Sequence, residues 1–270
     1  MRNLGADPFL MLCFFITLLV FVLIGGNISI ILLDGLRMLP QHLLDAENQF
    51  ALVLSVRCAS ISTALCFLLA VPTAYMLTRE QLPCRRVIEV ILELTMSLPY
   101  IVLGLSLLIL FSSPLGKELK AAGLPVVFDT NGIIMAQLVV NLPFAIKLCV
   151  MALQGVDHKV ELVAGLLGAS PWQRFRPILL PLCRNALIGS LVLIWSRALG
   201  EFGATLMLVG VTRMKTETLP GNIYLNVSSN DLDSAMASAF VLLLLSGISL
   251  AASNLLTGRE GGRRRYAAGG

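Results

Sequence analysis

The sequence predicts an all-α integral membrane protein with six transmembrane helices, and composition, hydropathy and length all support this fold class. Of its 270 residues, 57% are hydrophobic and 13% are charged, with a mean hydropathy of +0.85. Soluble domains carry about 25% charged residues. The length fits one domain of several spans with little left for a soluble module, so we expect residues 1–270 to form a single transmembrane domain.

Six stretches reach the roughly 20 mostly apolar residues that a membrane-spanning helix needs. The first is expected to stay uncleaved, because no small-x-small cleavage site follows it and "ISIILL" continues the run after Gly25 and Gly26. Pro99 in the third stretch and Pro143, with Asn141, in the fourth predict kinks. The expected spans cover residues 9–33, 50–78, 88–112, 132–153, 184–210 and 235–257.

The positions of Lys and Arg predict the orientation. With the N-terminus in the cytoplasm, the inside segments hold twelve of the 20 basic residues and the outside loops five. Cytoplasmic loops carry the excess of Lys and Arg, so both termini are expected in the cytoplasm. Outside, residues 34–49 look amphipathic and residues 211–234 are polar and turn-rich. Each is either a solvated loop or a contact for an extracytoplasmic partner.

The remaining composition excludes several functions. None of the six cysteines forms a CxxC pair, and with two histidines no zinc ligand set can be assembled. Reduced thiols acting as small apolar residues are the simplest interpretation. The net charge of +4 is too small to indicate nucleic acid. The chain also lacks the phosphate-binding pattern GxxxxGK[ST], so we expect it to bind no ATP and no cofactor.

Residues 154–183 form a long cytoplasmic segment between the fourth and fifth spans, and "ELVAGLLGASPWQRFRPILLPL" within it is unusually mixed. A short amphipathic helix is expected from Val160 to Leu167, with Gly168 at its end. Ser170 reads as the N-cap of a second helix and Pro171 as its first residue. Because proline disrupts helix interiors, Pro171 and Pro177 are expected to cut the segment into pieces.

The second of these pieces combines aromatic and basic side chains. Trp172 and Phe175 provide apolar anchors, while Arg174 and Arg176 are expected to face water or an acidic partner. Such a composition is typical of a protein interface. The alternative is an interfacial helix that rests on lipid headgroups.

The spacing of Ala164, Gly168, nine further residues and then Ile178-x-Leu180-Pro181 resembles the cytoplasmic EAA loop of ABC importer permeases. In that family the loop forms a coupling helix that docks into the ATP-hydrolysing subunit. The usual Glu of the family falls at Leu162 here, with Glu161 one place earlier. The resemblance implies an ATPase-coupling role for Glu161, Ala164, Gly168, Ala169, Ser170, Trp172, Arg174, Phe175, Ile178, Leu180 and Pro181.

A second resemblance narrows the branch. "SRALGEFGATLMLVG" at residues 196–210, followed by "MKTETLPGNIY", is similar to the molybdate, tungstate and sulfate permeases, particularly the molybdate type. "ALQGVDHKVELVAGLLGAS" and "SLPYIVLG" at residues 97–104 also resemble that branch. Together the similar segments cover most of residues 60–257.

The resemblance implies a type I ABC importer permease in a bacterial or archaeal plasma (inner) membrane. Two copies of the chain would form the pathway, two ATPase subunits would bind at the cytoplasmic face, and an extracytoplasmic binding protein would deliver the cargo. Molybdate or tungstate is the expected cargo, and sulfate or another anion is the alternative. ATP would be hydrolysed by the partner, so the chain itself is not expected to be an enzyme.

Two rival classes make different predictions. A secondary transporter requires inverted repeats and buried coupling charges, and we find no convincing repeat. A membrane-embedded enzyme requires a His, Asp and Glu cluster within its spans, and only scattered Glu and Arg are present.

Within the fifth span, Arg197 and Glu201 are four residues apart, so they are expected to share a helix face and to pair. Intramembrane charges face the bundle interior or a water-filled cavity. The pair therefore either lines the translocation path or dimer seam, or fixes helix packing. Glu89 and Glu93, near the start of the third span, are expected to pair with Arg85 or Arg86.

Uncharged residues complete the expected pathway. Ser196 and Thr205 either offer hydroxyls to a passing anion or bond to the local backbone. Gly200, Gly203 and Ala204 make a small-residue face that allows close helix approach. Pro99 joins this set, because kinked helices suit a gate.

Overall fold

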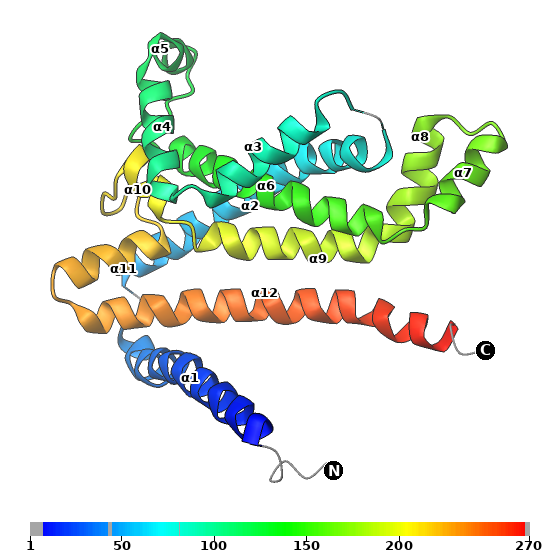
Figure 1. The fold of residues 1–270 in the computed structure, drawn as a ribbon. Helices are drawn as coiled ribbons and strands as arrows, with labels where there is room; N and C mark the ends of the chain where they lie inside the picture. Colours follow the sequence, from blue (N-terminus) through cyan, green and yellow to red (C-terminus); the bar gives the residue numbers. More distant parts are fainter. Residues whose placement is uncertain (1–7, 43–44, 81, 268–270) are drawn as a thin grey trace.

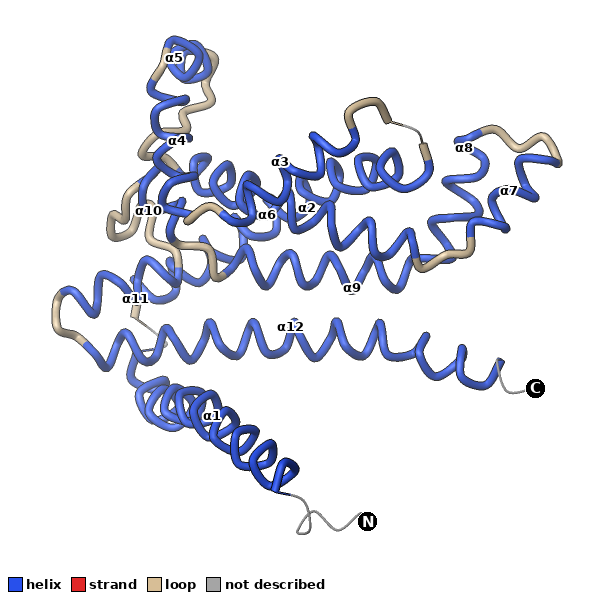
Figure 2. Tube along the Cα trace, in the orientation of Figure 1, coloured by secondary structure: helices blue, strands red, loops and turns tan. Residues whose placement is uncertain are grey.

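The computed structural model describes residues 8–42, 45–80 and 82–267, and this part of the chain is helical without strands (Figures 1 and 2). The expected all-α fold is confirmed. The elements are α1 (Pro8–His42), α2 (Ala46–Arg79), α3 (Arg85–Ser97), α4 (Tyr100–Ser112), α5 (Pro114–Ala121), α6 (Thr130–Gln154), α7 (His158–Leu166), α8 (Pro171–Arg174), the π-helical turn η1 (Phe175–Leu179), α9 (Leu180–Leu199), α10 (Gly203–Val209), α11 (Leu219–Ser228) and α12 (Leu232–Ala267).

Five of the described helical stretches are long and apolar enough to cross a membrane, and a bent pair makes a sixth if it is counted as one span. The pair is α3 and α4, which meet at 109°. The five stretches are Phe9–His42, Ala46–Arg79, Thr130–Gln154, Pro171–Leu199 and Leu232–Leu255.

The third span is therefore broken at Pro99, where a kink was expected, and residues 88–112 do not form one continuous helix. Leu98 and Pro99 both have extended backbone, with ψ of 140° and 134°. A proline pushes the residue before it out of the helical region, and this ends α3 at Ser97. By contrast, α6 runs through Pro143 without interruption.

The fifth span differs from the expected 184–210 at both ends. It begins earlier, because α8, η1 and α9 form one helical run from Pro171 to Leu199. It also ends earlier, because residues 200–202 interrupt the helix before α10 starts. Pro177 does not cut the segment as expected. It lies inside the wider π-helical turn, which accommodates the missing backbone donor.

The first helix is also longer than expected. Residues 34–42 continue α1 instead of forming a separate surface segment, and α2 begins at Ala46. Most of the apolar side chains of α1 are exposed. Near its end, Gly35 lies directly against Phe240 and the backbone carbonyl of Met236 in α12.

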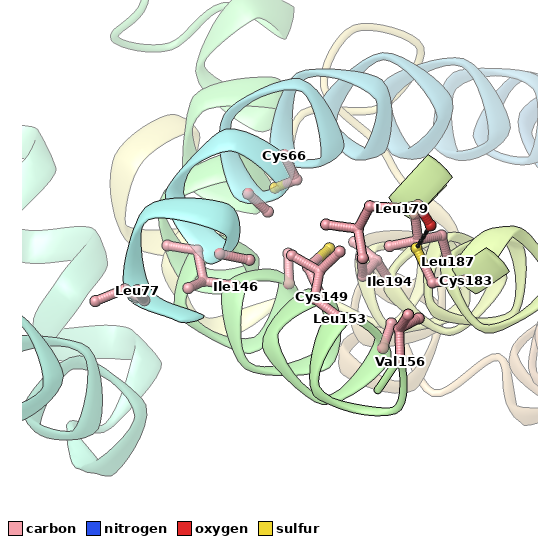
Figure 3. Packing of buried hydrophobic residues seen from close by; sticks show 14 residues of the cluster. Cys66, Leu77, Ile146, Cys149, Leu153, Val156, Leu179, Cys183, Leu187 and Ile194 are labelled. Atoms are coloured by element: carbon pink, nitrogen blue, oxygen red, sulfur yellow. Dashed lines mark hydrogen bonds between the residues drawn. The ribbon is translucent and has the colours of Figure 1, made fainter. Parts of the chain in front are cut away.

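The core lies between α2, α6 and α9 (Figure 3). Small residues with no exposed surface, such as Ala70 and Ala74, allow α2 and α6 to approach closely. All six cysteines lie in described residues and carry unbridged thiols, and four of them are buried like small apolar residues. Gln137 of α6 accepts a hydrogen bond from Ser62 of α2 at 2.9 Å and donates to the carbonyl of Ala198 at 2.9 Å. This side chain ties the three helices together.

Candidate functional site

Helices α7 and α8 with the turn η1 form a helical hairpin, residues 158–179, at the end of the bundle opposite α11 (Figure 1). The local signals in the sequence are confirmed. Gly168 has φ of +87°, the left-handed conformation that ends α7. Ser170 and Gln173 form a reciprocal capping box, with Gln173 N donating to Ser170 Oγ at 3.3 Å and Ser170 N donating to Gln173 Oε1 at 2.8 Å. Pro171 starts α8.

The outer surface of this hairpin is apolar. Leu166 and Leu167 are 81% and 84% exposed, and Trp172 is 63% exposed. Leu162 and Val163, at the positions of the usual Glu and the next family residue, are exposed as well. An apolar patch of this kind marks an interaction surface.

The inner side of the hairpin rests on the last turns of α2. The rings of Tyr75 and Phe175 meet edge to face, with centroids 5.1 Å apart. Together with Pro72, Pro171 and Trp172 they line a cleft of about 250 Å³.

The two arginines of the hairpin differ in their surroundings. Arg176 is exposed, with its guanidinium 5.9 Å from the centre of the Trp172 ring. Arg174 is half-buried and lies against Gly165 of α7, so it is less exposed than Arg176. The two arms of the hairpin fold against each other, and this explains why Arg174 is less exposed than Arg176.

The same turns of α2 carry a buried ion pair. Arg79 Nε lies 2.7 Å from Glu161 Oε1, and the two side chains are 7% and 2% exposed. Arg79 Nη2 also donates to the carbonyls of Leu153 at 2.9 Å and Val156 at 3.2 Å. Sequence reasoning counted Arg79 only as a cytoplasmic charge. Its partner lies far along the chain, so no local spacing signals the pair.

The expected coupling residues differ in burial. Glu161 is buried, Phe175 and Leu180 pack at the edge of the core, and Ile178 is half-buried. Ala164 and Ala169 are half-buried. The residues on the exposed side are Gly168, Ser170, Trp172 and Pro181.

A second polar site surrounds Arg197 near the end of α9. Its Nη2 donates to the hydroxyl of Tyr100, and its guanidinium carbon lies 4.7 Å from the centre of the Phe144 ring and 5.6 Å from that of Tyr100. Tyr100 is the first residue after the break at Pro99. Ser196 is half-buried beside this group. Neither Tyr100 nor Phe144 was predicted as a site residue, because neither stands at a spacing from Arg197 that would signal the contact.

Glu201 does not pair with Arg197, and that prediction is wrong. Because α9 ends at Leu199, the two residues do not share a helix face. Glu201 is instead buried at the start of α10, where its carboxylate accepts from Ala204 N at 2.8 Å and Thr205 N at 3.3 Å. It also accepts from the Thr205 hydroxyl, so this hydroxyl bonds locally.

The small-residue face is confirmed in part. Added Cβ atoms at Gly104 and Gly203 would meet Ala204 O at 2.6 Å and Tyr100 Cβ at 3.2 Å, so α4 and α10 are in close contact. A Cβ added at Gly200 would lie 3.9 Å from its nearest neighbour, the carbonyl of Arg197, so Gly200 is not part of this close contact.

Two ion pairs involve the first half of the third span, one within α3 and one between α3 and α6. Arg85 pairs with Glu89 at 2.8 Å as expected, but Glu93 pairs with Lys147 of α6 at 3.2 Å.

Within the described residues, no group of three His, Cys, Asp or Glu is placed to hold a metal ion.

Comparisons with known proteins agree with this architecture. Residues 67–257 match the family model described as "Binding-protein-dependent transport system inner membrane component". The molybdenum transport system permease protein ModB of Mycobacterium tuberculosis is 36% identical over 204 residues, which cover 75% of this chain and 77% of that protein. The sulfate transport system permease protein CysW of Escherichia coli K12 is 31% identical over 227 residues, 83% and 78% of the two chains.

Among solved structures, a bacterial ABC transporter involved in the import of alginate has the same fold, with a TM-score of 0.71 at 17% identity over 96% of this chain and 98% of that one. The chain belongs to the family of inner membrane components of binding-protein-dependent transport systems. The resemblance noted in the sequence is thereby confirmed.

Proposed function

We propose that the chain is the permease subunit of an ABC importer that moves a tetrahedral oxyanion, molybdate or tungstate, into the cytoplasm. The observation that carries this proposal is the 158–179 hairpin, which presents exposed Leu166, Leu167 and Trp172 at one end of a membrane-spanning bundle. Family membership and the names of the molybdenum and sulfate permeases among its relatives supply the reaction class and the cargo.

In this proposal the hairpin docks on a separate ATPase subunit. An exposed leucine and tryptophan surface is the chemistry that fills an apolar cleft in a protein partner. Two copies of the chain would enclose the pathway and bind two ATPases. ATP binding would bring the ATPases and the two hairpins together and open the pathway outward, and hydrolysis would reset it. ATP is hydrolysed in the partner, so this chain acts as a conduit.

We place the hairpin and both termini in the cytoplasm. The excess of Lys and Arg in the segments on that side supports this orientation. An extracytoplasmic binding protein would then deliver the cargo on the side of α5 and α11.

Arg197 is the group we propose for contact with the passing anion. A guanidinium offers a planar fork of N–H donors that matches the oxygens of an oxyanion, and it stays charged inside the membrane. The Tyr100 hydroxyl and the Phe144 ring hold it in place from two sides. Glu201 and Thr205 take no part in this contact, because they bond to each other and to the start of α10.

The test is ATPase activity in liposomes that contain the chain and its co-expressed ATPase. Binding protein loaded with molybdate or tungstate is expected to stimulate hydrolysis. If only the sulfate-loaded binding protein stimulates hydrolysis, sulfate is the cargo, the alternative that the CysW relative favours. If no ATPase copurifies with the chain, the proposed function is wrong.

A matched pair of variants tests the docking surface. Leu167→Glu places a charge on the hairpin and is expected to abolish copurification of the ATPase. Leu124→Glu changes a leucine that is 57% exposed between α5 and α6 and is expected to leave copurification intact. Equal recovery of the ATPase with both variants would contradict the assignment of the hairpin.

A further inference from the structure

We propose that Arg79 is the positioning residue that transmits the movement of the hairpin to α2 and α6. This inference rests on the proposed function, because it takes the hairpin as the element that the ATPase moves. Arg79 would act through Glu161 and would contact neither the ATPase nor the anion.

The first support is the way α7 is attached. Throughout α7, all of which the structure describes, Glu161 is the one buried side chain. The apolar residues Leu162, Val163 and Leu166 all point outward. Helix α7 therefore meets the bundle through a carboxylate and not through an apolar face. An apolar contact would let the helix slide, whereas a buried carboxylate must stay beside its cation, because separating the two charges inside the protein is costly.

The second support is the set of groups that converge on one guanidinium. Arg79 is the last residue of α2. It donates to the carbonyl of Leu153 in the last turn of α6 and to that of Val156 just after this helix, and it pairs with Glu161 in the first turn of α7. The last carbonyls of a helix have no partner within the helix. A cation there complements the dipole, and Glu161 does the same at the start of α7. Arg79 thus links three helix ends.

The third support lies one turn earlier on α2. Tyr75 packs edge to face on Phe175, which belongs to η1 in the other arm of the hairpin. The two arms are therefore both seated on α2, one through an ion pair and one through a pair of rings. Displacement of the hairpin would move α2, and α6 with it, because Arg79 belongs to α2, pairs with the hairpin and donates to α6.

The placement of the pair explains why Glu161 is not on the docking surface. With its side chain 2% exposed and 2.7 Å from Arg79, its carboxylate faces the bundle and is not available to a partner protein. The position of the usual family Glu is filled by exposed Leu162. In this chain the docking surface is apolar, and the charge of Glu161 instead pairs with Arg79 inside the protein.

The experiment compares Glu161→Gln with Glu89→Gln in the complete complex. Glu89 also pairs with an arginine, but that pair is exposed. The second variant therefore removes the same charge without breaking a buried ion pair. Both complexes are reconstituted in liposomes with loaded binding protein, and three quantities are measured: recovery of the ATPase, ATP hydrolysis with and without binding protein, and oxyanions transported per ATP.

Glu161→Gln is expected to retain the ATPase and its basal activity. The number of oxyanions moved per ATP should fall by about 2- to 30-fold, the range found when residues between coupled sites are changed. Glu89→Gln is expected to behave as the unchanged chain. An equal loss of transport and hydrolysis, with their ratio preserved, would overturn the proposal and leave Arg79 a structural residue.

Arg79→Lys provides the second variant if Glu161→Gln does not assemble. Lysine keeps the charge beside Glu161 but lacks the fork that also holds Leu153 and Val156. A smaller loss of coupling is expected. Coupling equal to that of the unchanged chain would show that the three-way link is not needed. Absence of any stimulation in the unchanged complex would instead refute the proposed function.

Discussion

The contact between α4 and α10 makes Gly104 sensitive to substitution. A Cβ at this position would lie 2.6 Å from Ala204 O and 2.7 Å from Ala204 Cα, both backbone atoms, and 2.8 Å from Met207 Cβ. Carbon atoms need about 3.5 Å, so Gly104→Ala must push the two helices about 0.8 Å apart. Overpacking of this kind costs about 1–3 kcal/mol.

Part of that cost is recovered, because alanine favours a helix over glycine by up to about 1 kcal/mol. With the full gain, a net loss of up to about 2 kcal/mol remains, and it should lower the thermal midpoint of the purified chain by up to about 8 °C. Transport should fall too, because Tyr100 lies one turn before Gly104 on α4 and would move with it. The control is Gly247→Ala in α12, where a Cβ meets nothing within 4 Å. Identical midpoints for the two variants would refute the close contact.

Two further predictions concern the start of α10 and the orientation. Glu201→Ala leaves two backbone N–H groups without an acceptor, at about 1–3 kcal/mol each, whereas Glu201→Gln keeps one acceptor. The alanine variant should therefore unfold at a lower temperature than the glutamine variant. The opposite order would contradict the capping role of Glu201. Cys84 is exposed in the loop between α2 and α3. A membrane-impermeant maleimide should modify it only after cells are permeabilised, as located by peptide mass spectrometry, and labelling in intact cells would reverse the proposed topology.

Signals confined to a few neighbouring residues predicted local structure well. Ser170, Pro171 and Gly168 specify caps and turns through their own backbone preferences, and each has its expected role. The break at Pro99 was likewise foreseen as a kink, although its 109° angle was not. Angles of this size depend on what the second half of the span packs against, and here α4 packs on α10.

Averages over long windows predicted less. Hydropathy continues through residues 200–210, so it did not reveal that α9 stops at Leu199, and the supposed pairing of Arg197 with Glu201 failed for the same reason. The partners of Arg79 and Arg197 come from distant elements, and one sequence contains no signal for such contacts. The expectation that Pro177 would interrupt the helix was wrong, because it assumed α-helical geometry and the residue lies in a π-helical turn.

That π-helical turn also sets a geometrical constraint on the chain. It places one more residue in its turn than a regular α-helix would, between the hairpin and the span that follows. Without that residue the turn would be α-helical, and the ring of Pro177 would clash with the carbonyl four residues earlier. Deleting a residue other than Pro177 from 175–179 would therefore kink or break the helical run at this proline. The extra residue keeps the hairpin and the span continuous across a proline.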